Sequence, residues 1–166
     1  MISAIVAVDE NWGIGFNGQL LEQIPEDMKF FKKITTGNVV IMGRKTWDSL
    51  PVKPLPDRLN LVITSQSRNV DCMTCFIDME EAKVRAAMAR HDREDNWFII
   101  GGGQIYKELL PLCDRVYVTK IHKAYENVDT YFPNLDESDE WTPALQTAIQ
   151  TYNDIAYQFW EYDRLS

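Results

Sequence analysis

The stretch Trp97–Tyr106, WFIIGGGQIY, decides the fold of this chain of 166 residues. Its first four residues are aromatic or β-branched, which favours a buried strand. Three glycines follow, at which the backbone can approach a ligand closely, and the residues after them are expected to open a helix. The glycines lack the GxGxxG spacing and could form only a flexible turn, so alone they are weak evidence for a phosphate site. A strand that runs directly into a helix indicates an α/β protein.

The same alternation of short apolar runs and amphipathic stretches extends along the chain. We predict buried strands at 3–8, 39–42, 59–63, 72–77, 97–100 and 115–121, helices at 25–35, 44–50, 79–91 and 103–110, and an edge or hairpin strand at 155–163. Strands that alternate with helices predict a mostly parallel sheet covered on both faces. The proline-rich stretch at 51–58 is expected to be a stiff loop. Since no linker is visible, we expect one domain spanning 1–166.

Composition and charge exclude several classes of protein. The chain has 45% hydrophobic and 25% charged residues, no apolar run near the about 20 residues of a membrane span, and no signal peptide pattern. We therefore expect a cytoplasmic monomer without a membrane partner. The net charge of −8 argues against nucleic acid as a partner. Residues 1–68 carry 8 Lys or Arg and 7 Asp or Glu, whereas residues 69–166 carry 9 and 18, so an anionic ligand should bind mainly to the first half.

The cysteines do not predict a metal site or a disulfide framework. Cys72 and Cys75 form a CxxC, but there is no second CxxC, and neither His91 nor His122 is close in sequence. The segment CMTCFI at 72–77 is better explained as a short strand in which the cysteines act as small apolar residues. We therefore predict no metal.

A carboxylate lies in the middle of the apolar face of the predicted helix at 25–35. Pro25 suits the first position of a helix, and Asp27 then falls on the same face as Phe31 and Ile34. An acid in the first turn can simply stabilise the helix end through the helix dipole. Alternatively, Asp27 faces a cleft, where loss of solvent raises its pKa and makes it a candidate catalytic acid. Both interpretations stay open at this point.

Three strand ends carry groups suited to phosphate. One has backbone N–H groups and two basic side chains at a helix start, the second has hydroxyl groups and an arginine, and the third has the glycines. A basic, solvated helix start is the alternative for the first. Because ligands of open α/β sheets bind beyond the carboxyl ends of strands, three such ends favour a dinucleotide with an extra phosphate, NADP rather than NAD. The residues are Gly43, Arg44, Lys45 and Thr46, then Thr64, Ser65, Ser67 and Arg68, then Gly101, Gly102 and Gly103.

Six motifs, in order and at matching spacing, closely resemble bacterial dihydrofolate reductase. They are VDENWGIGFNGQL, IPEDMKFFK, VIMGRKTWDSL, PLPDR, IIGGGQIY and DTYFP, and the resemblance runs from Met1 to Arg164 or so. It implies a central eight-stranded, mostly parallel sheet with a C-terminal antiparallel hairpin strand and four flanking helices. It also implies an oxidoreductase that uses NADPH to reduce 7,8-dihydrofolate, its small-molecule partner, to 5,6,7,8-tetrahydrofolate.

The resemblance implies roles for particular residues. Asp27 would hydrogen-bond the pterin ring and support protonation at N5 while hydride reaches C6, and Thr119 would share its hydrogen-bond network. Arg58 would bind the α-carboxylate of the glutamate tail, whereas an ordinary solvated charge is the alternative. The other substrate-binding residues implied are Ile5, Val6, Met28, Phe31, Leu50, Leu55 and Ile100. The cofactor-binding residues implied are Ala7, Ile14 and Tyr106 around the nicotinamide, Gly43, Arg44, Lys45, Thr46, Thr64, Ser65, Gly101, Gly102 and Gly103 at the phosphates and adenosine, and Gly15, Leu20, Ile63, Gln104 and Ile105.

The chain departs from the family pattern at Leu21-Glu22, where the family usually has Pro-Trp. Glu22 either points to solvent or reaches the mouth of the site and raises the pKa of Asp27 by like-charge repulsion. Gln104 stands where many members have a basic residue. The stretch at 11–20 resembles the mobile loop that the family closes over the nicotinamide, and a cis Gly–Gly peptide is implied before Gly102. A noncatalytic folate or NADP binder, and a reductase of a related pterin or pyrimidine, are the alternative functions.

Overall fold

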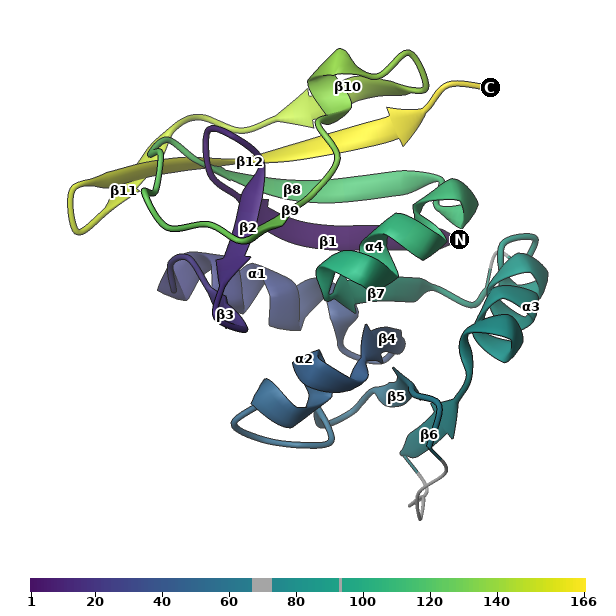
Figure 1. Ribbon diagram of the computed structural model, residues 1–166. Helices are drawn as coiled ribbons and strands as arrows, with labels where there is room; N and C mark the ends of the chain where they lie inside the picture. Colours follow the sequence, from purple (N-terminus) through teal and green to yellow (C-terminus); the bar gives the residue numbers. More distant parts are fainter. Residues whose placement is uncertain (67–72, 93) are drawn as a thin grey trace.

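The computed structural model describes residues 1–66, 73–92 and 94–166 (Figure 1). The strands of its main sheet are β1 (Ile2–Val8), β4 (Val39–Gly43), β5 (Leu59–Ile63), β6 (Thr74–Ile77), β7 (Trp97–Gly101), β8 (Arg115–Ile121), β10 (Trp141–Gln146), β11 (Gln150–Tyr152) and β12 (Ile155–Arg164). The helices are α1 (Pro25–Thr35), α2 (Arg44–Ser49), α3 (Met79–Ala89) and α4 (Gly103–Leu109), with 3-10 turns η1 (Leu110–Leu112) and η2 (Leu135–Glu137). Within the described ranges no helix is both long and apolar enough to span a membrane.

The predicted elements are confirmed, with ends that differ by a few residues. The largest differences are two residues: α3 ends at Ala89 and not at 91, and β6 begins at Thr74 and not at 72, pairing with β5 from Asn60 to Ile63. Cys72, the first residue of the predicted strand, lies outside the described residues. Cys75 is half-buried in β6, so the apolar role expected for it is only partly fulfilled.

The main sheet follows the order β10-β12-β8-β1-β7-β4-β5-β6, and β11 pairs with β12. Figure 1 shows it running from β10 at the top of the view to β6 at the bottom. The six strands from β8 to β6 are parallel, whereas β12 pairs antiparallel with β8. The α/β class, the mostly parallel sheet and the antiparallel C-terminal strand are therefore confirmed. The carboxyl ends of β1, β4, β5 and β7 meet at one edge of this sheet.

Each face of the sheet has its own hydrophobic cluster. On one face, buried residues of β1, β4, β5 and β7 pack with Trp47 of α2 and with half-buried residues of α1. On the other face, the alternate residues of the same strands pack with α3 and α4, whose buried residues include Ala86 and Leu109. Helices therefore cover both faces, as the alternating pattern predicts.

A second sheet of three strands was not predicted. It consists of β2 (Gly13–Phe16), β3 (Gln19–Leu20) and β9 (Thr130–Tyr131), in the order β3-β2-β9. Asn17 and Gly18, both with positive φ, form the two-residue turn between β2 and β3. Because β9 pairs with β2, the segment that follows β1 is tied to a part of the chain that is far away in sequence.

The start of α4 lies so close to β9 that a side chain does not fit there. A Cβ built at Gly103 would lie 2.5 Å from Cγ2 of Thr130. We expect Gly103→Ala to lower the free energy of unfolding by about 1–3 kcal/mol, because α4 and β9 would have to move apart. Urea unfolding measures the effect. The double variant Gly103→Ala, Thr130→Ser should recover most of it, since serine lacks the clashing methyl group, and equal destabilisation of both variants would contradict the explanation.

Candidate active site

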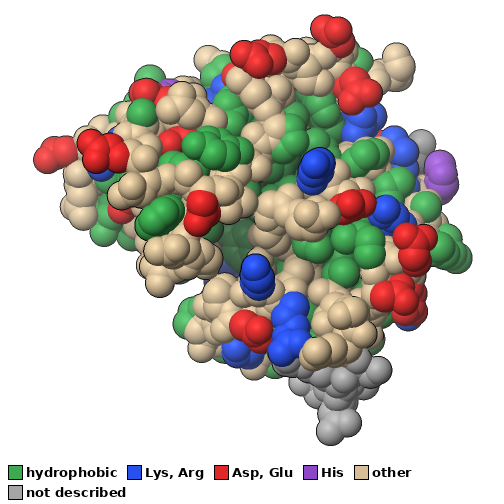
Figure 2. All heavy atoms as spheres, viewed as in Figure 1, with side chains coloured by type: hydrophobic (Ala, Val, Ile, Leu, Met, Phe, Trp, Pro, Cys, Tyr) green, Lys and Arg blue, Asp and Glu red, His purple; other side chains and the backbone are tan. Residues whose placement is uncertain are grey.

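The carboxyl ends of four parallel strands bring predicted site segments to one edge of the main sheet. β1 ends before Asp9, β4 runs directly into α2, β5 ends before Thr64, and β7 turns through glycines into α4. In Figure 2 the surface is hollowed between α2 and the β2–β3 hairpin, with Lys and Arg side chains on the α2 side of the hollow. These segments therefore lie together, as predicted. Ser67 and Arg68 are outside the described residues.

Asp27 lies in the first turn of α1, which begins with Pro25 and has no side-chain cap at Ile24. Asp27 is half-buried, and the hydroxyl of Thr119 on β8 donates a hydrogen bond of 2.5 Å to its Oδ1. Burial raises the pKa of Asp27, and the hydrogen bond from Thr119 opposes that rise because it stabilises the ionised form. The carboxyl group therefore holds a proton more readily than an exposed aspartate does.

Five of the predicted substrate-binding residues share one hydrophobic cluster. They are Ile5, Phe31, Leu50, Leu55 and Ile100. Phe31 lies one helical turn after Asp27, so the carboxylate and the cluster are on the same face of α1. Val6 instead joins the cluster on the opposite face of the sheet, because successive residues of a strand alternate. Met28 is 55% exposed and adds an apolar side chain open to solvent.

Arg58 is buried, with 4% of its surface exposed, so the solvated charge considered as an alternative is wrong. Its Nε donates to the carbonyl oxygen of Pro56 at 2.8 Å, and its Nη1 donates to Oγ1 of Thr35 at 3.1 Å. Burial lowers the pKa of Arg58, and the neighbouring Asp57 opposes this. Within the described residues no carboxylate forms an ion pair with Arg58. A buried cation without an anionic partner is suited to bind an anionic ligand.

Two glycines of the third predicted phosphate-binding segment lie close to Thr46 of α2. Gly101 has φ +136°, and a Cβ built there would lie 3.3 Å from Oγ1 of Thr46. The peptide bond from Gly101 to Gly102 is cis, as the resemblance implies. On α2, Nη1 of Arg44 donates to Gln66 at 2.8 Å, while its buried Nε has no hydrogen-bond partner. The same Nε is 3.4 Å from a carboxylate oxygen of Asp48, which partly neutralises its charge.

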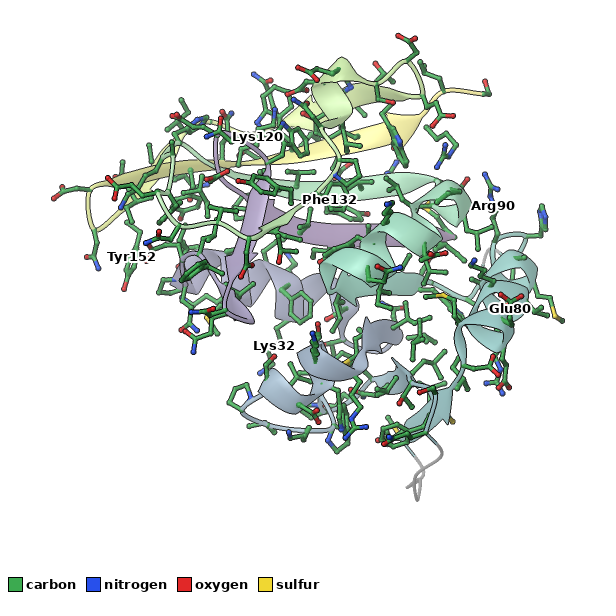
Figure 3. The ribbon with its side chains drawn as sticks, viewed as in Figure 1. Lys32, Glu80, Arg90, Lys120, Phe132 and Tyr152 are labelled. Atoms are coloured by element: carbon green, nitrogen blue, oxygen red, sulfur yellow. The ribbon has the colours of Figure 1, made fainter. Side chains whose placement is uncertain are left out.

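The other predicted cofactor residues differ in how far they are exposed. Tyr106 is buried, and its hydroxyl donates to the carbonyl oxygen of Ile5 at 2.7 Å, so this hydroxyl already has a protein partner. Figure 3 labels Phe132, whose ring is 5.1 Å from that of Tyr106 between centroids. Gln104 donates to Glu108 at 3.2 Å on the exposed side of α4. Ile14, Ile63 and Ile105 are buried, Ala7, Gly15, Thr64, Gly102 and Gly103 are half-buried, and Leu20, Lys45 and Ser65 are exposed.

The segment from residue 9 to residue 24, which we call the site loop, is held to the β8–β9 segment (residues 122–129). Within the loop, Oδ1 of the buried Asp9 accepts from the backbone N–H groups of Asn11 at 2.9 Å and Gly13 at 2.7 Å, while its Oδ2 accepts from the backbone N–H of Tyr125 at 3.2 Å. Asp129 donates its backbone N–H to the carbonyl oxygen of Gly15 at 3.0 Å and accepts from the N–H of Asn17 at 3.0 Å. Neither Asp9 nor Asp129 was predicted as a site residue: Asp9 has local partners two and four residues away, whereas Asn17, the partner of Asp129, is 112 positions away.

Glu22 fits neither alternative that the sequence raised. It is half-buried, and the hydroxyl of Tyr125 donates a hydrogen bond of 2.8 Å to its Oε2. The side chain therefore does not simply point to solvent. The pKa of Asp27 is raised by burial and not by Glu22, so the like-charge hypothesis is wrong. Tyr125 was not predicted, because it is 103 positions from Glu22 and no local pattern links the two.

Comparison with known proteins covers almost the whole chain. The family model described as dihydrofolate reductase matches residues 1–164. The chain belongs to the dihydrofolate reductase family. A dihydrofolate reductase of Bacillus subtilis (strain 168) is 37% identical over 165 residues, which is 99% of this chain and 95% of the relative. One from Neisseria gonorrhoeae is 40% identical over 163 residues, or 97% and 96%. A bifunctional dihydrofolate reductase-thymidylate synthase of Daucus carota is 40% identical over 97% of this chain and 33% of its own length.

Membership of the dihydrofolate reductase family makes the protein an enzyme, an oxidoreductase that acts on a small molecule. The relatives reported above are named as dihydrofolate reductases, alone or joined to thymidylate synthase, so the resemblance stated from the six motifs is confirmed. In the described part of the chain, no three His, Cys, Asp or Glu side chains are grouped as metal ligands would be.

Proposed function

We propose that the protein reduces 7,8-dihydrofolate to 5,6,7,8-tetrahydrofolate and that its hydride donor is NADPH. The observation that carries this proposal is the half-buried carboxylate of Asp27, which is hydrogen-bonded to Thr119 and lies on the apolar face of α1. Reduction of the C6–N5 double bond needs one hydride and one proton. A carboxyl group whose pKa is raised by burial is suited to support the delivery of that proton at neutral pH.

In this proposal the protein holds both ends of the dihydrofolate molecule, the pterin ring and the glutamate tail. The flat pterin ring packs against the cluster that contains Ile5 and Phe31, and Asp27 hydrogen-bonds its polar edge. Asp27 thereby orients the ring and supports protonation at N5, while Thr119 holds the carboxylate in place. At the other end, Arg58 binds the α-carboxylate of the glutamate tail. Three N–H groups of its guanidinium are not used by Pro56 or Thr35, which leaves a fork for a carboxylate.

The described residues fit a phosphorylated nicotinamide cofactor at the strand ends. Gly101 and Gly102 bring backbone without side chains next to the hydroxyl of Thr46, and Arg44 has a buried Nε without a hydrogen-bond partner. When bound, NADPH supplies the hydride. Arg44 and Lys45 add positive charge in the half of the chain with the less negative balance, which favours the extra phosphate of NADPH. Apolar residues such as Ile14 exclude water from the nicotinamide side, which keeps the two rings in a reactive geometry.

The test is a direct assay. Purified protein is mixed with dihydrofolate and either NADPH or NADH, and the loss of reduced-nicotinamide absorbance is followed. We expect turnover with a clear preference for NADPH. Equal use of NADH would overturn the cofactor assignment. If calorimetry showed that both ligands bind without turnover, the protein would be a binder and the proposed reaction would be wrong.

Thr119 offers a test of the proton step. Its hydrogen bond favours ionised Asp27, so Thr119→Ala should raise the pKa of that carboxyl group further. If the hydride-transfer rate needs protonated Asp27, the fall in this rate with rising pH should move to higher pH in the variant. The matched control is Thr142→Ala on β10, because the Thr142 hydroxyl makes no hydrogen bond within the described residues. A pH profile that moved to lower pH, or not at all, would contradict this role.

A further inference from the structure

The site loop is held at three places, and they differ in which atoms the loop contributes. At its start, the loop uses the carboxylate of Asp9, which accepts from the backbone N–H of Tyr125, and the backbone N–H of Glu10, which donates to the carbonyl oxygen of Lys123 at 3.1 Å. At Asp129 it uses backbone N–H and C=O groups. Near its end the loop uses the side chain of Glu22, which accepts the hydrogen bond from the Tyr125 hydroxyl. This third contact can be removed by changing one side chain while the contacts at the other two places stay available.

Tyr125 is itself well fixed, so it can hold Glu22 in position. Its backbone N–H donates to Oδ2 of Asp9 at 3.2 Å, and its side chain packs against the buried cluster of Ile24, Ile121 and Tyr157. The Nζ of Lys123 lies 4.7 Å from the centroid of the same ring. Tyr125 thus contacts both ends of the site loop: the carboxylate at its start, and Ile24 at the point where α1 begins.

The contact between Glu22 and Tyr125 is strong enough to matter. Both side chains are half-buried, and the acceptor is a carboxylate, which forms stronger hydrogen bonds than a neutral group does. Burial and the neighbouring Glu22 raise the pKa of the Tyr125 hydroxyl, so it stays a donor at neutral pH. A hydrogen bond to a charged group changes an equilibrium by about tenfold or more, which is enough to shift a loop between held and released states.

We propose that Glu22 is a positioning residue for the reaction: with Tyr125 it forms a latch that holds the end of the site loop against the β8–β9 segment. The proposal rests on the proposed function. The latch favours the arrangement in which β2 and β3 lie over the nicotinamide side of the site and α1 presents Asp27. In this chain, which has Leu21-Glu22 where the family usually has Pro-Trp, Glu22 then makes a polar contact that the Pro-Trp pair does not offer.

The first experiment compares Tyr125→Phe with Tyr152→Phe. Both changes remove one hydroxyl, and Tyr152, labelled in Figure 3, is an exposed residue at the end of β11. In Tyr125→Phe we expect hydrogen exchange of the backbone amides at 13–22 to be about tenfold faster, with exchange in β4 unchanged. The hydride-transfer rate should fall by about three- to tenfold, while KM for dihydrofolate changes by less than about twofold. Tyr152→Phe should change none of these.

The second experiment tests the acceptor. Glu22→Gln keeps an oxygen that can accept from Tyr125 but loses the charge, so its loop exchange and hydride-transfer rate should lie between those of wild type and Tyr125→Phe. Glu22→Ala should behave like Tyr125→Phe. The double variant Glu22→Ala, Tyr125→Phe should be no worse than either single variant, because both remove the same contact.

Two results would overturn the latch. The first would be that Tyr125→Phe and Tyr152→Phe show the same rate of amide exchange in the loop, or the same rate of hydride transfer. The second is additive losses in the double variant, since these would mean that Glu22 and Tyr125 act separately. The exchange measurement needs no substrate. A wild-type protein that failed to reduce dihydrofolate would therefore refute the proposed function, while loop exchange would still decide whether the latch exists.

Discussion

Asp27→Asn is expected to lower the turnover of dihydrofolate at neutral pH by about 10²–10⁴-fold, the range typical for loss of a general acid or base. Asparagine is nearly isosteric with aspartate and can still accept the hydrogen bond from Thr119, but its side chain does not ionise. Stopped-flow measurement of hydride transfer gives the effect. Binding of NADPH, followed by calorimetry, should be nearly unchanged because the carboxylate is assigned to the pterin end of the site.

The stability of the same variant separates a functional acid from a structural one. Because burial raises the pKa of Asp27 above its ordinary value of 3.8, the unfolded chain ionises first as pH rises. The folded state therefore loses stability between 3.8 and the raised pKa, and above that pKa the loss is complete. Asp27→Asn removes this penalty, so its Tm relative to wild type should be higher at pH values above the raised pKa than in acid. A variant that lost NADPH binding and stability together with turnover would mean that Asp27 is structural.

Arg58→Lys is expected to raise KM for dihydrofolate by about 10- to 100-fold and KM for NADPH by less than about twofold, because lysine keeps the charge but loses the planar fork that binds a carboxylate. The size of the effect follows from the burial of Arg58, which allows little rearrangement around a shorter head group. Steady-state kinetics with each substrate varied in turn measures both constants.

A substrate without the glutamate tail is the control for this second variant. Lysine cannot make both contacts of Arg58 to Pro56 and Thr35, so some loss of stability is expected in any case. A dihydropterin that lacks the tail makes no contact with residue 58 in the proposed pose. Its KM should therefore be the same in wild type and variant. A parallel increase for both substrates would show that the change distorts the pterin end, and the assignment of Arg58 to the tail would be wrong.

Local patterns predicted the elements of the fold well. The α/β class followed from the alternation of apolar runs and amphipathic stretches, and Pro25 marked the start of α1 correctly. The β2–β3 hairpin was missed although its Asn17-Gly18 turn is a strong hairpin signal. The reason is that the two strands are only four and two residues long, and the stretch also resembles a mobile loop.

Long-range contacts explain what the sequence left open at the candidate site. Asp27 stood out because it broke a local apolar pattern on a helix. Its hydrogen bond to Thr119 spans 92 positions and was implied only by the resemblance. Tyr125 and Asp129 carried no local signal, since each holds a segment more than 100 positions away. Val6 was expected to line the pterin pocket beside Ile5. Because successive residues of a strand alternate, the Val6 side chain lies on the other face of the sheet from Ile5.

The central position of β1 has a consequence for how the chain folds as it is made. β1 leaves the ribosome well before its partners β7 and β8, at residues 97–101 and 115–121. Until those strands emerge, the apolar residues of β1 and β4 have no finished sheet to join, and Thr119 cannot meet Asp27. Pairing over such distances is slow, so the nascent chain exposes apolar surface until residues 97–121 have been made. A ligand that binds only the completed site can stabilise the protein only after synthesis of these strands, by shifting the folding equilibrium toward the native state.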